Sequence, residues 1–328
     1  MVDKVIFYWS GRVPQIGQLA LASALEKFPD AEVHLYLDQD EGFESSLPAE
    51  MNWVHAFARF KVLNFSLQEM LSRQGFSLYN PSRHFRERFA NAVFQAFHSS
   101  KLRKRSHFTS ILKTYFPHWH HNRIYGWSRS GMVSHSIRWG GVVYRDDLFK
   151  LVVHAEYPGE GFICSDLDVC FVANSESWPL ESSFLSRWGH EPWGNPSVLY
   201  FHPKRERLTR EFRASLDALV PASPWHFFSD ERCKSYGLTV LPTDLFDPIW
   251  SEGSLSQGNS DLFFQDTEGS VSIVKEIEAQ NLAVHWHNHW NTVPEAGSPF
   301  SRFMERLDVT HGDRRDLGDS SRRLDLLG

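Results

Sequence analysis

Two aspartates separated by one residue could bind a metal ion. Asp166 and Asp168 lie between two apolar runs, residues 161–165 and 169–172, which predict two strands joined by a tight junction. On an extended backbone, side chains two positions apart point to the same face, so the two carboxylates would converge. Carboxylate oxygens are typical ligands of Mg²⁺ and Mn²⁺, and such an ion can neutralise the phosphates of a nucleotide diphosphate as it leaves. A plain turn or helix cap is the alternative for an isolated pair.

Residues 284–290 place three histidines at alternate positions. His285, His287 and His289 begin within a stretch, residues 282–286, that predicts a strand, so all three would share one face if the chain stays extended. Imidazole nitrogens are common metal ligands and can donate to phosphate. The histidines could complete the aspartate site from a distant part of the chain, or they could form a zinc site of their own. A second histidine cluster, residues 118–121, is more typical of an exposed loop.

Asp147 and Lys150 lie one helical turn apart in residues 146–155, which predict a short helix. A surface ion pair is the simplest interpretation. Because the helix comes directly before the Asp-x-Asp strand, the pair could instead hydrogen-bond the hydroxyls of a donor sugar and neutralise a phosphate or sugar oxygen.

The elements that would position these residues follow an α/β pattern. Residues 4–9 are a continuous apolar run typical of a strand covered on both faces, a helical pattern follows up to Phe28, and residues 32–37 predict a second strand. A right-handed βαβ unit of this kind belongs to a mostly parallel sheet, whose ligand sites lie at the carboxyl ends of its strands. Residues 197–201 and 237–241 predict further strands, and residues 204–219 predict a helix.

The sequence predicts one domain over residues 1–292. An insertion at about residues 66–125 is expected to be helical, and it carries a basic run at residues 101–105 among aromatic residues. The simplest interpretation is an amphipathic helical hairpin with a solvated charged face. The alternative is a patch for an acceptor or for peripheral contact with a membrane surface. Residues 293–328 are polar and mixed in charge, so we expect a poorly packed tail.

Composition limits the class of protein. The 328 residues are 41% hydrophobic and 14% aromatic, which is enough for a sizeable core. A formal charge of −6 gives no overall field for nucleic acid, so no nucleic-acid partner is expected. Three cysteines without metal-ligand spacing argue against a disulfide scaffold and favour a reducing compartment. Because the sequence shows no signal peptide or membrane span, we expect a cytoplasmic protein, or one peripheral to the inner face of the membrane.

Several short motifs occur in order along the chain. Residues 6–11 resemble I-H-x-x-W-x-G, with Phe7 in place of the histidine, and residues 28–31 resemble a P-D-[YA] step before a short strand. Asp147 and Lys150, followed by two glycines and Asp166, resemble S-D-x-x-R-x-x-x-L-x-x-x-G-G-x-Y-x-D-x-D with lysine for arginine and a slightly longer spacing. Residues 195–203 and 241–248 resemble N-x-x-[IV]-x-x-x-x-x-H-P and L-P-x-x-x-F-x-P.

Together these motifs resemble the retaining Asp-x-Asp glycosyltransferases of the GT-A fold, particularly the group of the yeast initiating mannosyltransferase, bacterial capsular-polysaccharide transferases and clostridial-toxin glucosyltransferase domains. The resemblance implies a Rossmann-like, mostly parallel sheet flanked by helices, with a helical insertion. It also implies transfer of a sugar from a nucleotide-diphosphate donor, UDP being preferred over GDP, to a hydroxyl of a saccharide or glycolipid such as a surface-polysaccharide intermediate. Retention at the anomeric carbon and a Mn²⁺ or Mg²⁺ cofactor are further implications.

The resemblance also assigns roles to single residues. Trp9 would stack on the donor base, Tyr8 would bind the donor, and His285 would be the preferred third metal ligand or diphosphate contact, with His287 in reserve. The implied metal ligands are Asp166, Asp168, His285 and His287; the implied donor-binding residues are Tyr8, Trp9, Asp147, Lys150, Asp166 and Trp290; the implied catalytic residues are Asp147, Lys150 and Asp168.

Two other functions compete with this interpretation. Asp166, Asp168 and the late histidines could form the binuclear site of a metal-dependent phosphoester or glycoside hydrolase. Alternatively, residues 285–289 could hold a structural zinc ion in a non-catalytic zinc-binding or sugar-binding module.

Overall fold

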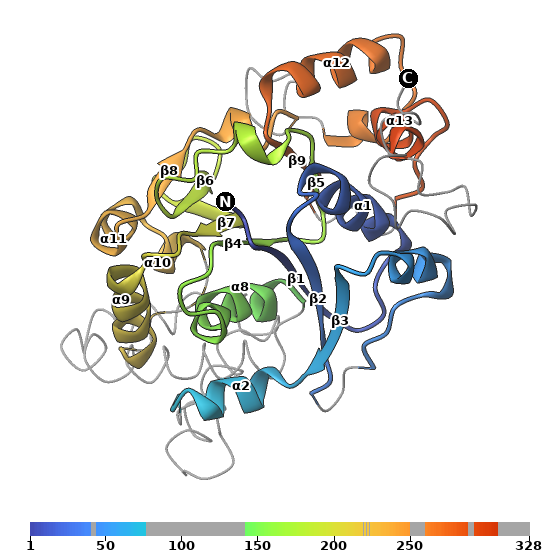
Figure 1. The fold of residues 1–328 in the computed structure, drawn as a ribbon. Helices are drawn as coiled ribbons and strands as arrows, with labels where there is room; N and C mark the ends of the chain where they lie inside the picture. Colours follow the sequence, from blue (N-terminus) through green and yellow to red (C-terminus); the bar gives the residue numbers. More distant parts are fainter. Residues whose placement is uncertain are drawn as a thin grey trace, which may run out of the picture.

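The larger of two β-sheets forms the centre of the molecule. The computed structural model describes residues 1–40, 44–76, 142–218, 220, 222, 224–249, 260–287 and 292–307. Within these ranges a seven-stranded sheet has the order β3-β2-β1-β4-β7-β6-β8, and a second sheet pairs β5 with β9. Helices cover both faces of the larger sheet (Figure 1). The expected α/β class, with a mostly parallel sheet flanked by helices, is therefore confirmed.

The elements have the following bounds. The strands are β1 (Lys4–Ser10), β2 (Glu32–Asp38), β3 (Phe60–Phe65), β4 (Phe162–Ser165), β5 (Val169–Phe171), β6 (Phe184–Arg187), β7 (Gly194–Phe201), β8 (Thr239–Leu241) and β9 (Ala283–His285). The helices are α1 (Gln18–Lys27), α2 (Leu67–Arg73), α8 (Val142–Val153), α9 (Glu206–Asp217), α10 (Pro224–Phe227), α11 (Asp230–Tyr236), α12 (Ser270–Gln280) and α13 (Pro299–Arg306).

The order of the strands changes direction at β1. The chain moves outward from β1 to β2 and β3 with parallel pairing, then returns to add β4 in parallel on the other side of β1. β7 is antiparallel to both β4 and β6, and β8 is parallel to β6. In open α/β sheets, ligands bind outside the carboxyl ends of the strands at such a switch point. Here those ends are Ser10 and Ser165, so the expected ligand position lies beside Asp166.

Alternate side chains of the central strands supply the two halves of the core. In β1, Val5 and Phe7 belong to a cluster with α1, α12 and α13, whereas Ile6 and Tyr8 belong to a cluster with α2, α8 and α9. Figure 1 shows α8 and α9 on one side of the sheet and α1 and α12 on the other. Because both faces are apolar and covered, the central strands carry the continuous hydrophobic runs seen in the sequence.

A buried ion network holds the carboxyl end of β2 against α8. Arg145 donates from Nε to Asp38 Oδ2 at 2.9 Å, and its Nη2 also pairs with Asp38 and Asp40. Tyr8 donates its hydroxyl to Asp38 at 2.6 Å. Burial lowers the pKa of Arg145, but Tyr8 and Asp38 outweigh this effect and raise it, so the guanidinium stays charged. Loss of one partner would leave a buried charge uncompensated, which makes this network a strong local constraint.

The C-terminal segment contradicts the expectation of a poorly packed tail from residue 293. Ser298 begins α13 by accepting a hydrogen bond from the Ser301 N–H at 3.2 Å. Phe300, Phe303 and Met304 then bury one side of the helix in the main core. Their i, i+3, i+4 spacing explains the packing, because it puts all three side chains on one helical face. The prediction is wrong for this helix, and residues 308–328 lie outside the described residues.

Part of the predicted helical insertion can be compared with the structure. α2 is a helix that begins after the cap Ser66, whose hydroxyl accepts from the Glu69 N–H at 3.0 Å. Residues 77–141, with the basic run 101–105 and the histidines of 118–121, lie outside the described residues. The three cysteines are buried free thiols, in keeping with a sequence that argues against a disulfide scaffold.

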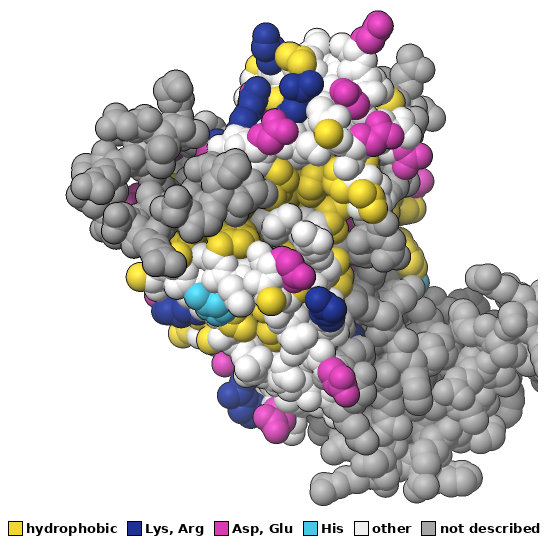
Figure 2. Space-filling view, turned by 90° about the vertical axis from the view of Figure 1, so that its right-hand side faces the viewer, with side chains coloured by type: hydrophobic (Ala, Val, Ile, Leu, Met, Phe, Trp, Pro, Cys, Tyr) yellow, Lys and Arg dark blue, Asp and Glu magenta, His cyan; other side chains and the backbone are white. Residues whose placement is uncertain are grey.

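The described surface mixes charges of both signs. On the face shown in Figure 2, Lys and Arg side chains are interspersed with Asp and Glu, and hydrophobic side chains gather between them. Across the described ranges, no helix has the length and apolar character that crossing a membrane requires.

His154 should make the fold sensitive to acid. Its ring packs against Phe201 and Phe212, and burial together with Arg205 lowers its pKa to about 4. The unfolded chain binds a proton on this residue below about pH 6.5, whereas the folded chain does so only near pH 4, so stability falls over this window. The loss from this group is on the order of 3 kcal/mol.

The His154→Leu variant should therefore lose less stability than the parent protein between pH 6.5 and 4. Urea unfolding at a series of pH values measures this difference, with the exposed His55→Leu as the matched control. Parallel stability curves for the parent and His154→Leu would contradict a neutral buried imidazole.

Candidate active site

The Asp-x-Asp pair lies on a turn that is anchored on three sides. Asp166 follows the last residue of β4, and its N–H donates to the Ser197 carbonyl of β7 at 2.8 Å. Leu167 is buried and lies so close to Gly17 that a Cβ there would come within 2.9 Å of its Cδ2. The Asp168 carbonyl accepts from the Trp286 N–H at 3.0 Å. The extended backbone expected between the two strands is replaced by this turn, but the carboxylates still converge.

His285 reaches the two carboxylates from the far end of the folded chain. The antiparallel pairing of β5 with β9 sets Val169 opposite His285, which brings the imidazole beside Asp168. His285 Nε2 lies 3.3 Å from Asp168 Oδ1 and 3.9 Å from Asp166 Oδ2. One ligand atom from each of these three side chains lies within 4.8 Å of the others. The structure therefore brings together the three residues that the sequence analysis preferred as metal ligands.

The charges of this group suit a cation. Burial lowers the pKa of His285, but Asp168, Asp247 and Asp166 outweigh this effect and raise the pKa to about 9. Burial raises the pKa of Asp166, but Lys150 and His285 outweigh it and hold the pKa at about 2. Without a metal ion, the protonated imidazole therefore supplies positive charge among the carboxylates. A divalent ion would take the place of that proton, because imidazole binds metals through a free nitrogen.

The donor set fits a divalent cation on chemical grounds. Two carboxylates and one imidazole are ligands that Mn²⁺, Mg²⁺ and Zn²⁺ all accept. Asp168 is almost fully buried, whereas the Asp166 side chain is 26% exposed, so a cation would face both protein and solvent. Such a position leaves room for ligands from a bound substrate.

Lys150 supports Asp166 from inside the protein. Its ammonium is 1% exposed, pairs with Asp166 and lies 2.6 Å from Asp146 Oδ2. The partner of Lys150 on its own helix is thus Asp146, four residues earlier, and not Asp147 as the sequence analysis proposed. The surface alternative for this lysine is wrong as well, because the side chain is enclosed.

Asp147 is buried close to these charges. Burial raises its pKa to about 7, with Asp166 adding to the rise and Lys150 opposing it. Burial also raises the pKa of Asp146. α8 therefore presents two carboxyl groups and one ammonium at the edge of the Asp-x-Asp turn.

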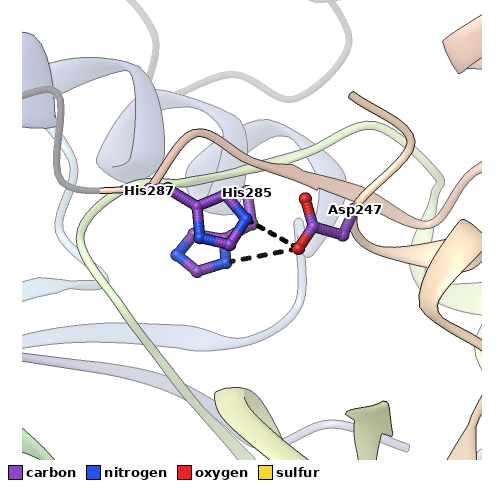
Figure 3. A group of neighbouring side chains, drawn as sticks. All are labelled: Asp247, His285 and His287. Atoms are coloured by element: carbon purple, nitrogen blue, oxygen red, sulfur yellow. Dashed lines mark hydrogen bonds and ion pairs between the residues drawn. The ribbon is translucent and has the colours of Figure 1, made fainter. Parts of the chain in front are cut away.

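His287 faces a different carboxylate. It has a positive φ of 51°, so the chain turns after β9 instead of continuing in the extended conformation that the sequence predicted. Its Nε2 lies 2.7 Å from Asp247 Oδ2, and its ring centroid lies 3.9 Å from that of His285. Figure 3 shows both rings directed at the same carboxylate. His287 therefore belongs with Asp247, and the grouping of metal-binding side chains around Asp166 and Asp168 does not include it.

Tyr8 and Trp9, two aromatic residues expected to bind the donor, are both buried. The Tyr8 hydroxyl bonds to Asp38 and Arg145 and is enclosed between β1 and α8. Trp9 packs in the main core and donates from Nε1 to the Arg12 carbonyl at 3.0 Å. Trp290, the third expected aromatic contact, lies outside the described residues, as does His289.

Sequence reasoning missed two residues that the structure places at or beside the site, and a third that holds the carboxyl end of β2. Asp146 is next to Asp147, which the motif comparison selected instead. The only sequence signal for Asp146 is its i, i+4 spacing to Lys150. Asp247 lies inside the L-P-x-x-x-F-x-P motif, but as a variable position of that motif. Arg145 precedes the acidic pair and gave no separate signal.

Comparison with known proteins gives only distant similarity. No protein-family model and no curated protein sequence matches this chain. Solved structures that are similar to it include the WbbM bifunctional glycosyltransferase in its apo form, the PaToxG glycosyltransferase and an active-site mutant of LgtC.

The similarity to WbbM has a TM-score of 0.44 at 8% identity and covers 99% of this chain and 51% of that one. PaToxG has a TM-score of 0.34 at 12% identity, covering 94% of this chain and 87% of that one. LgtC has a TM-score of 0.39 at 12% identity, covering 93% and 95%. The chain spans about half the length of WbbM. Structural similarity at this level does not assign an activity to the chain.

Replacing Lys150 should destabilise the site more than any exposed lysine can. Lys150→Met would leave Asp146, Asp147 and Asp166 without their buried cation, and breaking a buried pair in this way costs about 3–5 kcal/mol. The loss should shrink as the pH falls from 7 towards 4, because the unfolded chain then also protonates its carboxylates. Urea unfolding measures both effects.

The exposed Lys234→Met is the matched control and should change the free energy of unfolding by less than about 0.5 kcal/mol. Equal stabilities for Lys150→Met and the control would contradict the assigned ion pairs.

Proposed function

We propose that this protein is a metal-dependent glycosyltransferase of the GT-A type that uses a nucleotide-diphosphate sugar. One observation carries the proposal: Asp166, Asp168 and His285 converge at the carboxyl end of β4, at the switch point of the sheet. The position favours a nucleotide ligand, and the donor set favours a divalent ion that faces a diphosphate. The ordered motifs of the sequence support the same class of enzyme.

In this proposal Asp166, Asp168 and His285 hold Mn²⁺ or Mg²⁺. When bound, the ion would neutralise the charge that develops on the leaving diphosphate. The protein's own groups then act mostly by placement and electrostatics. Asp168 is held by the hydrogen bond that its carbonyl accepts from the Trp286 N–H. Asp166 is held by the hydrogen bond from its N–H to the Ser197 carbonyl of β7 and by its ion pair with Lys150.

The roles of the remaining site residues follow from their burial. Lys150 acts through Asp166 as a positioning residue, because its ammonium is enclosed and already paired. Asp147, with its raised pKa, is the group on α8 that we propose for the donor sugar hydroxyls. Tyr8 supports the carboxyl end of β2 through Asp38 and Arg145, Trp9 is proposed for stacking on the donor base, and Trp290 is proposed as a further donor-binding residue.

The finer specificity rests on the sequence motifs. They favour UDP as the donor nucleotide, retention at the anomeric carbon, and a saccharide or glycolipid acceptor such as a surface-polysaccharide intermediate. We extend the proposal to a peripheral position at the inner membrane face, on the basis of the basic residues 101–105.

The metal ligands can be tested by nucleotide binding. Isothermal titration with UDP should show binding that needs Mn²⁺ or Mg²⁺, and Asp166→Asn and Asp168→Asn should each weaken it at least tenfold, which corresponds to about 1.4 kcal/mol. The exposed Asp230→Asn is the matched control, since its carboxylate pairs only with Arg187 in the described structure and should leave binding unchanged.

Nucleotide binding that is equally tight in chelator would remove the metal from the mechanism. Release of free sugar or phosphate as the only product, with every acceptor class offered, would favour the hydrolase instead. Inversion at the anomeric carbon, measured by NMR of the product, would contradict the retaining assignment.

A further inference from the structure

We propose that Asp247, His285 and His287 form a second cation site, selective for Zn²⁺, that shares His285 with the Asp166 and Asp168 site. The second site lies on the opposite edge of the His285 ring. Its existence does not depend on glycosyl transfer; only its effect on the first site rests on the proposed function.

Three ligand atoms already converge on one point. Asp247 Oδ2 lies 2.7 Å from His287 Nε2 and 4.0 Å from His285 Nδ1. One ligand atom from each side chain lies within 4.8 Å of the others. Figure 3 shows the two imidazoles lying over one another with their nitrogens towards the same carboxylate oxygen. A zinc ion among these three ligand atoms would replace the 2.7 Å hydrogen bond between His287 Nε2 and Asp247 Oδ2 and reach typical bond lengths of about 2.0–2.2 Å after the side chains shift.

The Nδ1 atom of His285 supplies a separate reason to expect a ligand. It is buried, and within the described ranges it has no hydrogen-bond partner at normal distance. Buried polar atoms of native proteins are nearly always paired, so an exception needs an explanation. A cation between Nδ1 and the Asp247 carboxylate would satisfy this nitrogen.

The backbone also holds His287 in an uncommon conformation. Its φ of 51° is in the left-handed region, which costs energy for a residue other than glycine. Continued extension would carry the ring away from Asp247, because the turn is what lays it over His285. On the other side, the His285 N–H donates to the Phe246 carbonyl at 3.0 Å, which holds β9 next to Asp247.

The chemistry of the ligands distinguishes the two sites. The first site offers two carboxylates and one imidazole and suits the oxygen-preferring Mg²⁺ and Mn²⁺. The second offers two imidazoles and one carboxylate, the three-ligand set with an open position that is common for zinc.

The shared ring makes the two sites antagonistic. A neutral imidazole has one nitrogen that accepts and one that carries a proton. When Nδ1 binds zinc, Nε2 keeps its proton and cannot be a ligand beside Asp166 and Asp168. Zinc at the second site should therefore weaken Mn²⁺ binding at the first, which would make it an inhibitory ion.

Zinc binding to the full-length protein, measured by isothermal titration with Zn²⁺ alone, tests the site. The parent protein should bind one ion per chain, and Asp247→Asn and His287→Gln should each weaken it at least tenfold. Asp166→Asn and the exposed His55→Gln should bind zinc as the parent does. Thermal unfolding of each variant shows that a loss of binding is not a loss of folding.

The predicted antagonism between zinc and manganese binding is measured separately. One equivalent of Zn²⁺ should weaken Mn²⁺ binding at least tenfold in the parent protein and less than half as much in folded His287→Gln, where zinc can act only by direct competition at the first site. The proposal is overturned if Asp166→Asn removes zinc as completely as His287→Gln does, since one site would then hold either ion, or if no stoichiometric zinc binds. If zinc binds as expected in all variants but UDP binding does not depend on Mn²⁺, the proposed glycosyltransferase function is rejected and the zinc site is retained.

Discussion

The pairing of β5 with β9 is the constraint on which the whole site depends. It sets Val169 opposite His285 and so joins the Asp-x-Asp turn to a segment from the far end of the chain. A two-stranded sheet is marginal on its own. Here Val169, Phe171 and Val284 pack into the main core, and the Phe171 N–H donates to Ser23 of α1 at 3.0 Å. Hydrophobic packing thus fixes a geometry that the polar groups alone could not hold.

The second feature of the site is an excess of buried negative charge. Among the described residues, Asp146, Asp147, Asp166 and Asp168 lie around two cationic groups, Lys150 and a protonated His285. Carboxylates at such depth are costly unless they are paired or coordinate a metal. Burial, with Asp166 adding to it, raises the pKa of Asp147, and the carboxylates beside it make the turn attractive to a divalent ion.

Hydrophobic patterns in the sequence predicted the helices and strands that short stretches of sequence determine. The apolar run of β1, the helix α1 and the strand β2 follow directly from hydrophobic periodicity and are confirmed. α13 carried a similar signal, since Ser298 is a good cap and Phe300, Phe303 and Met304 have helical spacing. Because the surrounding residues are polar, the sequence analysis assigned this short helix to a poorly packed tail.

Contacts between distant segments could not be predicted in the same way. The sequence placed Asp166, Asp168 and His285 as candidates, but nothing local pairs β5 with β9 or brings Asp247 to His287. The sequence also could not decide whether Lys150 pairs with Asp146 or Asp147, because residues three and four positions earlier are both neighbours on a helix. Tyr8, which the motifs assign to the donor site, packs in the core cluster that contains α8.

The most direct test of the central claim is to locate the metal itself. In crystals grown with Mn²⁺ and UDP, anomalous scattering should place manganese within about 2.5 Å of carboxylate oxygens of both Asp166 and Asp168, with a diphosphate oxygen in the same coordination sphere. Bound UDP whose diphosphate is held by protein groups alone, with manganese absent from this turn, would contradict the account.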